Sequence, residues 1–335
     1  MARLTRSGSI PGELALIEAI RTQAARTRSS AVRMGIGDDC AVLRPRAGYE
    51  ICVTTDFSLE GRHFRRELHP PQSVGHRCLA RGLSDLAAMG AEPLAVFLSL
   101  ALPARTPSAW LDGFLDGLLA LARKHRVPLA GGDTAESSEG IAADIAAVGQ
   151  VPTGAARMRS GATPGDALYV TGALGGAAAE LRALAARPRK FRKLTRATRD
   201  DAHPHLYPEP RLEAGRRLQR IATAMIDLSD GLSTDLTHLC RASGVAAVID
   251  EAALPIHPLA LEQPDAMRLV LHGGEDYELL FTAAARTRVP RTIAGVPVTR
   301  IGTVRRTARG TPLITLRTRD GQTTSLEAGG WEHFA

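Results

Sequence analysis

Five short stretches of this chain place acidic side chains beside glycine or at the ends of apolar, strand-like runs. They read GIGDDC, TTDFSLEG, AGGDT, IDLSDG and GGEDYE. A solvated turn explains any one of them, because Gly and Asp are favoured turn residues. Five together predict a site on loops over a rigid scaffold, and hard oxygen ligands of this kind suit Mg²⁺. The carboxylates concerned are those of Asp38, Asp39, Asp56, Asp133, Asp227, Asp230, Glu275 and Asp276.

Several nucleotide-binding patterns are absent. The chain has no Gly-Lys pair, which excludes the P-loop G-x-x-x-x-G-K-[ST]. It also has no H-R-D or D-F-G, which excludes the protein-kinase fold. The stretch TGALGGA misses the G-x-G-x-x-G spacing. A bound nucleotide is therefore expected to reach the aspartates through Mg²⁺, with little help from lysine.

Strand-like and helix-like runs alternate along the chain and must position these groups. A stop signal at Gly90, Pro107 in the first turn of a helix and a Gly-Gly-Asp turn after residue 130 mark some of the expected ends. The mixture predicts an α/β (α+β) fold in two domains, 1–152 and 153–335. We expect strands at 51–55, 94–102, 127–134, 141–152, 166–172, 277–284, 298–304 and 312–318, helices at 72–90, 107–125 and 173–186, and a strand, an acidic turn and a helix over 222–243.

Length and composition indicate a globular protein. The 335 residues suggest about two domains at roughly 150 residues each, and 44% of the residues are hydrophobic. No apolar run reaches the ~18 residues that span a bilayer, and the N-terminus lacks an apolar signal core. We expect a cytoplasmic protein with no membrane partner. Without a C-x-x-C pair, Cys40, Cys52, Cys78 and Cys240 are expected to be reduced core residues.

The formal net charge of +7 raises the alternative of a nucleic-acid-binding protein. The basic residues are mostly scattered arginines, with one cluster over 182–199. Only Phe191 interrupts that cluster with an aromatic ring, so a solvated helix or loop is favoured. The alternative predicts binding that falls steeply with salt and leaves the acidic turns unexplained. We expect no nucleic-acid partner.

Seven motifs in order carry a more specific signal. They are GIGDDCAVL, TTDFSLEGRHF, GLSDLAAMGAEP, AGGDT, SGATPGDALYVTG, IDLSDGLSTDL and GGEDYELLFT. This series resembles the thiamine-monophosphate kinase family, in the superfamily of aminoimidazole ribonucleotide synthetase. The resemblance runs from about Gly35 to Thr282, with a short tail match at GGWEHFA and no motif over 183–207.

The resemblance implies ATP-dependent phosphorylation of thiamine monophosphate, giving thiamine diphosphate and ADP. It also implies a homodimer whose N-terminal mixed sheet forms the dimer interface and the ATP site, with a C-terminal α/β sandwich. The acceptor phosphate is already anionic near pH 7, so positioning and charge neutralisation are expected to limit the rate.

The family motifs also imply roles for single residues. Asp39, Asp56 and Asp230 are the strongest catalytic candidates. The nucleotide is expected at Gly132, Asp133, Arg159 and Ser229. The acceptor substrate is expected at His63, Glu275 and Trp331, with Gly329 and Gly330 letting the tail swing. The implied ligands of several Mg²⁺ ions are Asp39, Thr54, Thr55, Asp56, Asp85, Asp133, Asp227 and Asp230.

Each role has a structural alternative. Thr54 and Thr55 are strand formers that could simply pack. Asp85 could form an i,i+4 pair with Arg81, although its apolar surroundings suggest a buried carboxylate that needs a cation. Ser229 could cap the following helix. Trp331 and Phe334 could only pin the C-terminus to the core.

Other enzymes of the superfamily are the nearest alternatives. A selenophosphate synthetase is expected to carry a reactive Cys (or selenocysteine) and a Lys near its N-terminus, and residues 1–39 contain neither Cys nor Lys. An aminoimidazole ribonucleotide synthetase fits GGEDYELLFT and the C-terminal motif less well.

Overall fold

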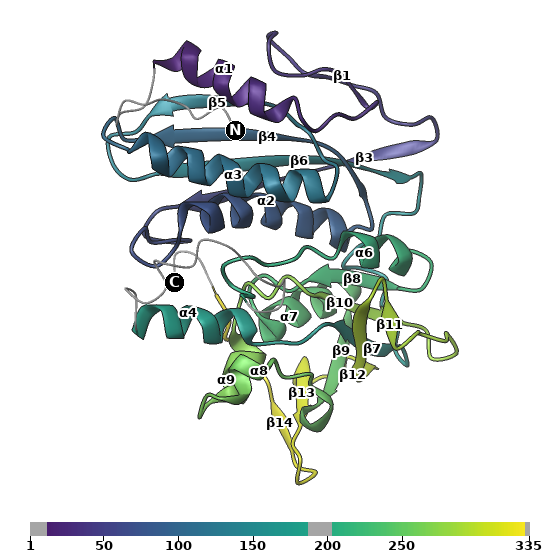
Figure 1. Cartoon of the computed structure of the whole chain (residues 1–335). Coiled ribbons are helices and arrows are strands. Elements are labelled where there is room, and N and C mark those ends of the chain that lie inside the picture. Colours follow the sequence, from purple (N-terminus) through teal and green to yellow (C-terminus); the bar gives the residue numbers. More distant parts are fainter. Residues whose placement is uncertain (1–11, 187–202, 332–335) are drawn as a thin grey trace. The chain divides into compact units, whose positions relative to one another are not determined.

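The computed structural model describes residues 12–186 and 203–331 (Figure 1). They divide into two compact units. The first holds the described residues 12–86, 92–154 and 184–186, and the second holds 87–91, 155–183 and 203–331. Both units combine sheet and helices, as the alternating runs predict.

The first unit is built on a four-stranded sheet with the order β3-β6-β4-β5. Strands β4 and β5 run parallel, and the other neighbours are antiparallel. Helices α2 and α3 lie side by side along the sheet (Figure 1). The elements of this unit are α1 (Glu13–Ala24), β1 (Val32–Met34), β2 (Val42–Leu43), β3 (Tyr49–Leu59), α2 (Pro71–Ala88), β4 (Glu92–Leu102), α3 (Ser108–Lys124), β5 (Leu129–Glu136) and β6 (Ala142–Pro152).

Glycines allow α2 to approach its neighbours closely. A Cβ on Gly75 would lie 1.8 Å from the carbonyl oxygen of Phe114 in α3. A Cβ on Gly82 would lie 3.1 Å from the Cβ of Ala147 and 3.3 Å from the Cγ2 of Ile145, both in β6. A glycine inside a helix costs about 1 kcal/mol relative to alanine. Here the close contact with the sheet explains why Gly82 stands inside the helix.

Strand β3 alternates between two environments. Ile51, Val53 and Phe57 point to one side and are 46%, 65% and 60% exposed. Thr54 points to the other side, where its hydroxyl donates a hydrogen bond to Asp85 of α2. Because successive side chains of a strand face opposite ways, Asp56 shares the face of Thr54, and Thr55 shares the face of Phe57.

The second unit contains a larger sheet with the order β14-β13-β9-β12-β7-β10-β8, and β11 pairs with β12. Leu232, Leu236 and Leu239 of α7 are buried in the same core as residues of β7, β8 and β10. The elements of this unit are β7 (Ala167–Thr171), α4 (Gly176–Ala186), α6 (Leu212–Leu218), β8 (Ala224–Asp227), α7 (Leu232–Ser243), β9 (Val245–Asp250), η1 (Glu251–Ala253), α8 (Pro258–Leu261), α9 (Ala266–His272), β10 (Leu279–Ala283), β11 (Thr292–Ile293), β12 (Val296–Arg306), β13 (Ile314–Arg317) and β14 (Thr323–Ser325).

Most expected elements are present, but two acidic motifs are not turns. Strand β5 continues through Gly131, Gly132 and Asp133 to Glu136, so the expected Gly-Gly-Asp turn is wrong. Parallel pairing with β4 keeps this segment extended, with Ser99 opposite Asp133. Asp56 lies inside β3 rather than at its end.

Helix ends differ slightly from the expected ones. Pro107 precedes α3 as its N-cap instead of lying in the first turn. Helix α4 begins at Gly176 rather than near residue 173, and both Gly172 and Gly175 have positive φ. Gly90 has φ +69° just after α2 and confirms the expected stop.

The cysteines only partly fit the expectation. All four are free, and Cys78 and Cys240 are buried core residues. Cys40 is exposed and Cys52 is half-buried, so their assignment to the core is wrong.

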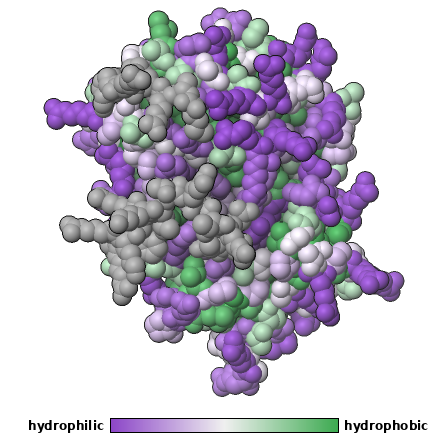
Figure 2. Space-filling model, viewed as in Figure 1, coloured by the Kyte–Doolittle hydropathy of each residue, from purple (hydrophilic) through white to green (hydrophobic). Residues whose placement is uncertain are grey.

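Polar side chains dominate the face of the molecule drawn in Figure 2, where hydrophobic side chains form only small groups. Within the described ranges, no helix is both long enough and apolar enough to cross a membrane.

Candidate active site

A cavity in the first unit brings together two of the acidic motifs. Its volume is about 910 Å³, and it is lined by the loop 35–41, by parts of β4 and β5 and by two isoleucines of α1. Asp38, Asp39, Gly132 and Asp133 all line this cavity. The cavity combines apolar side chains with carboxylates, as expected for a site that takes a mixed apolar and polar ligand.

Local hydrogen bonds explain how the carboxylates at the cavity are held. Asp38 accepts a hydrogen bond from the backbone N–H of Asp39 at 2.9 Å, and Asp133 accepts one from the N–H of Thr134 at 2.8 Å. Gly132 has φ +150°, and a Cβ there would lie 1.8 Å from the carbonyl oxygen of Leu98. The pairing of β5 with β4 is therefore sufficient by itself to require glycine at position 132.

The other expected metal ligands of this unit lie elsewhere on the sheet. Thr54, Asp56 and Asp85 share the α2 side of β3, and Asp85 is half-buried rather than buried. The sheet register places Ile145 and Leu98 between Asp56 and Gly132. Three strand spacings of ~4.8 Å separate these edges by about 14 Å. Thr55, the remaining expected ligand, faces the opposite side of β3 with Phe57. Within the first unit, the expected ligands thus do not form one group.

His63 has a defined tautomer. Its Nδ1 accepts a hydrogen bond from the backbone N–H of Leu59 at 3.0 Å. A neutral ring must then carry its proton on Nε2. The buried Arg77 donates a hydrogen bond from Nη1 to the carbonyl oxygen of His63 at 3.0 Å and fixes the backbone there. These two hydrogen bonds hold the ring and the backbone of His63 in place.

In the second unit, two acidic motifs pair through their backbones. The N–H of Glu275 donates to the carbonyl oxygen of Ser229 at 2.8 Å, and the N–H of Tyr277 donates to that of Leu228 at 2.9 Å. Glu275 and Tyr277 have φ values of +67° and +50°, which are uncommon for residues with side chains. Strained backbone of this kind clusters at functional sites.

The C-terminal tail joins the same place. The N–H of Trp331 donates to the carbonyl oxygen of Asp230 at 3.1 Å, and the N–H of Gly330 donates to Oγ1 of Thr234 at 3.1 Å. A Cβ on Gly330 would lie 1.9 Å from the carbonyl oxygen of Asp230. Glycine at position 330 thus permits close packing of the tail, and the expected swing of the tail at Gly329 and Gly330 stays a prediction. The structure brings Ser229, Asp230, Glu275 and Trp331 together.

Sequence reasoning missed Asp235, which organises the start of α7. Its Oδ2 accepts hydrogen bonds from the N–H groups of Asp230 and Gly231, each at 3.1 Å. Gly231 is the N-cap of α7, so the alternative role of Ser229 as the cap is wrong. Burial and the carboxylates of Asp227 and Asp230 raise the pKa of Asp235 to about 8. Its position in the first turn after the IDLSDG motif is the signal that was available in the sequence.

The remaining acids of GGEDYE have structural partners. Asp276 accepts hydrogen bonds from the N–H groups of Gly175 and Ala177, at 2.7 and 3.1 Å, and so occupies the N-terminus of α4. Glu278 accepts hydrogen bonds from Oγ1 of Thr171 at 2.6 Å and from Nε of Arg211 at 2.9 Å. The glycine-rich segment before α4 therefore already binds a carboxylate of the chain itself, which agrees with its lack of a dinucleotide fingerprint.

Two family models match the chain. The AIR synthase related protein N-terminal domain matches residues 37–151, and the corresponding C-terminal domain matches residues 163–313. The thiamine-monophosphate kinases of Salmonella typhimurium and Escherichia coli are each 40% identical over 323 residues, covering 92% of this chain and 95% of theirs. The chain belongs to the thiamine-monophosphate kinase family. The resemblance of the seven motifs is thus confirmed.

Solved structures agree with this family. The thiamine-monophosphate kinase of Stenotrophomonas maltophilia K279a has a TM-score of 0.77 and 37% identity, covering 93% of this chain and 98% of that one. AaThiL complexed with AMPPCP and TMP has a TM-score of 0.73 and 29% identity, covering 96% and 97%. The hydrogenase maturation protein HypE, at 17% identity and a TM-score of 0.73, shares the fold.

Arg159 stands apart from the other residues that the thiamine-monophosphate kinase motifs single out in the second unit. It is exposed, and its carbonyl oxygen accepts a hydrogen bond from Oγ of Ser243 at 2.9 Å. Ser243 ends α7, whereas Ser229 precedes its start. A helix of 12 residues is about 18 Å long, so the backbone of Arg159 is not close to Ser229.

No three His, Cys, Asp or Glu side chains of the described residues are grouped as a ready metal cage. Mg²⁺ does not need such a cage, because it usually takes one or two carboxylates together with waters and substrate phosphates. In the first unit, Thr54 and Asp85 offer hydroxyl and carboxylate oxygens of the kind that Mg²⁺ prefers. In the second unit, Asp227 and Asp230 offer carboxylate oxygens of the same kind. The residues present therefore fit this ion.

Most of the basic cluster expected over 182–199 lies outside the described residues, as does Phe334. Arg182, its first member, forms an ion pair with Asp265, with Nη2 at 3.0 Å from Oδ2.

Proposed function

We propose that this chain transfers the γ-phosphoryl group of ATP to thiamine monophosphate, forming thiamine diphosphate and ADP. The observation that carries the proposal is the 40% identity to thiamine-monophosphate kinases over 92% of the chain. The grouping of Ser229, Asp230, Glu275 and Trp331 supports it, because these residues come from three separate motifs.

The reaction requires little acid–base catalysis from the protein. The bond between the γ-phosphorus and the β,γ-bridging oxygen breaks, while an oxygen of the acceptor phosphate bonds to the γ-phosphorus. That acceptor oxygen is anionic near pH 7, so no strong general base is needed. The protein must bring two polyanions together and hold them in line. We assign His63 to this task from its place in the family motif TTDFSLEGRHF, because an imidazole can bind a phosphate.

Carboxylates and hydroxyls are proposed to hold Mg²⁺ with the nucleotide. When bound, the ion neutralises charge that develops on the phosphate oxygens. The pKa of Asp235, raised first by burial and then by the carboxylates of Asp227 and Asp230, supports this, because a cation would relieve the repulsion among these carboxylates. The proposed ligands are Asp39, Thr54, Thr55, Asp56, Asp85, Asp133, Asp227 and Asp230, of which Asp39, Asp56 and Asp230 are the most important.

The remaining family residues are proposed to bind the two substrates. Gly132, Asp133, Arg159 and Ser229 are assigned to ATP. Glu275 and Trp331 are assigned to the thiamine rings, because a carboxylate and an indole face both favour the cationic thiazolium.

A homodimer is proposed through the face of the first unit's sheet that lies opposite α2. Ile51, Val53 and Phe57 expose a row of apolar side chains on this face of β3. Apolar surface of this kind is typical of a subunit interface. The molar mass in solution, measured by light scattering, tests the dimer, and a monomer at micromolar concentration would contradict it.

The function is tested by ADP release with ATP and Mg²⁺ over four acceptors: thiamine monophosphate, free thiamine, selenide and formylglycinamidine ribonucleotide. Thiamine monophosphate is expected to give the fastest release. Equal or faster release with free thiamine, or release only with one of the other two, would refute the assignment.

A further inference from the structure

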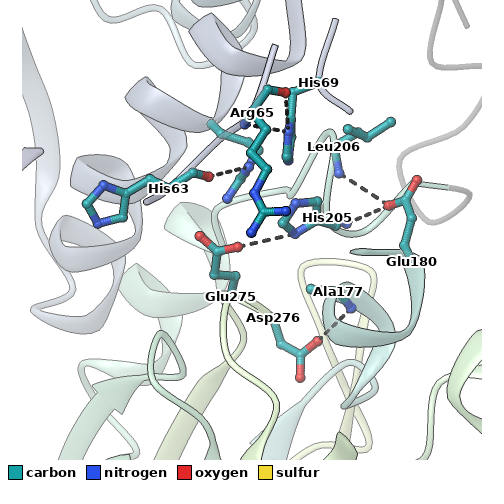
Figure 3. Close-up of polar contacts among 10 residues, drawn as sticks. His63, Arg65, His69, Ala177, Glu180, His205, Leu206, Glu275 and Asp276 are labelled. Carbon is teal, nitrogen blue, oxygen red and sulfur yellow. Dashed lines mark hydrogen bonds and ion pairs between the residues drawn. The ribbon is translucent and has the colours of Figure 1, made fainter. Parts of the chain in front are cut away.

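Glu275 is held through its backbone and through its side chain. Its N–H donates to the carbonyl oxygen of Ser229 at 2.8 Å, and its φ of +67° sets an unusual direction for the side chain. At the other end, Oε2 lies 3.2 Å from Nδ1 of His205 (Figure 3).

His205 is itself firmly placed. It is only 2% exposed, and its backbone N–H donates to Oε2 of Glu180 at 2.7 Å. The same oxygen accepts a second hydrogen bond from the N–H of Leu206 at 3.2 Å (Figure 3). Glu180 is buried on α4, so a regular helix fixes the backbone of the segment that carries His205.

Burying the imidazole of His205 costs free energy unless a polar partner compensates for it. The neighbouring carboxylate of Glu275 is such a partner. A glutamate side chain has three rotatable bonds, and holding it in one conformation before the ligand arrives reduces the entropy lost on binding. The polar contact between Nδ1 of His205 and Oε2 of Glu275, at 3.2 Å, provides this restraint.

We propose that His205 is the positioning residue for the carboxylate of Glu275, which it holds ready for the cationic ring of the acceptor substrate. The inference rests on the proposed function, since that function makes Glu275 a substrate-binding residue. It assigns a role to a residue outside the seven family motifs, in the part of the chain where no motif was recognised.

Two amide substitutions of His205 distinguish a role in positioning Glu275 from a role in packing alone. The amide nitrogen of asparagine can occupy the place of Nδ1, whereas that of glutamine corresponds to Nε2. His205→Asn is therefore expected to keep the polar contact with Glu275, and His205→Gln is expected to lose it. His203→Gln is the matched control. His203 lies two residues before His205, and its Nδ1 is 2.7 Å from Oε1 of Glu180, so the same substitution removes a different histidine–carboxylate contact.

The measurement is steady-state turnover of the full chain at varied thiamine monophosphate and varied ATP, together with the melting temperature. His205→Gln is expected to raise the KM for thiamine monophosphate about 10-fold or more, since it removes a buried polar contact with a charged group. The KM for ATP is expected to stay within about two-fold. His205→Asn and His203→Gln are expected to stay within about three-fold of the wild type for both.

Three results would overturn the inference. An unchanged KM for thiamine monophosphate in His205→Gln removes the positioning role. Equal effects of the Asn and Gln variants, or a joint rise of both KM values with a lower melting temperature, would indicate a packing role. If the wild-type chain does not turn over thiamine monophosphate, the proposed function fails and the inference fails with it. Normal wild-type turnover combined with any of the three results overturns the inference alone.

Discussion

The backbone N–H of Trp331 lies 3.1 Å from the carbonyl oxygen of Asp230. This hydrogen bond ties a residue near the end of the chain to the acidic turn before α7. Trp331 is 48% exposed, although its backbone is anchored by this hydrogen bond. The tail is thus attached to the same turn that carries the proposed ATP and Mg²⁺ ligands Ser229 and Asp230.

Trp331→Ala tests the proposed stacking role. Loss of the indole face is expected to raise the KM for thiamine monophosphate roughly 2- to 30-fold, corresponding to ~0.5–2 kcal/mol of cation–π attraction or stacking. The KM for ATP and the melting temperature are expected to change little. A lower melting temperature with both KM values intact would mean that the tail only pins the C-terminus.

Gly330→Ala tests the docking of the tail without touching the indole. The new Cβ would meet the carbonyl oxygen of Asp230 at 1.9 Å, so the tail must move away. We expect a rise in the KM for thiamine monophosphate similar to that of Trp331→Ala. Gly12→Ala is the matched control, because nothing lies within 4 Å of its added Cβ. Unaltered kinetics in Gly330→Ala would show that the docked position is not needed.

Asp56→Asn tests the metal role of the α2 face of β3. Removing a charge that contacts the metal is expected to lower kcat by roughly 10²-fold or more. The fold is expected to survive, because the isosteric amide fits the same place, and relief of carboxylate repulsion can raise stability without Mg²⁺. Asp265→Asn is the control, because it makes the same chemical change in a surface ion pair with Arg182. Near-normal turnover of Asp56→Asn at limiting Mg²⁺ would contradict the assignment.

The raised pKa of Asp276 predicts that the stability of the protein depends on pH. Burial raises its pKa to about 7, against the hydrogen bonds from Gly175 and Ala177, which lower it. At pH 5–6 the folded protein then holds a proton that the unfolded chain has released. The free energy of unfolding is therefore expected to fall as the pH rises from about 4 to about 7, by on the order of 4 kcal/mol, and to level off above that.

Urea unfolding of the wild type and of Asp276→Asn at several pH values checks this. The difference in stability between the two proteins is expected to change in favour of the variant as the pH rises. Parallel curves across the whole range would show that Asp276 does not titrate in this window.

The sequence by itself determined the chemically active residue types of this protein and most of its secondary structure. The apolar runs predict most strands and helices because local periodicity reports which faces are buried. The motif series was specific enough to indicate the family. Helix starts were predicted less accurately, as at Pro107 and Gly176, because the terminal turns of a helix depend on neighbouring contacts.

Only the tertiary structure decided which of these residues meet. Pairing across the sheets keeps Asp133 inside a strand and places Asp56 and Gly132 on opposite edges. Hydrogen bonds between distant segments join Trp331 to Asp230, and an ion-pair contact joins His205 to Glu275. Such contacts depend on strand order, register and close glycine packing, and none of these leaves a local pattern in the sequence.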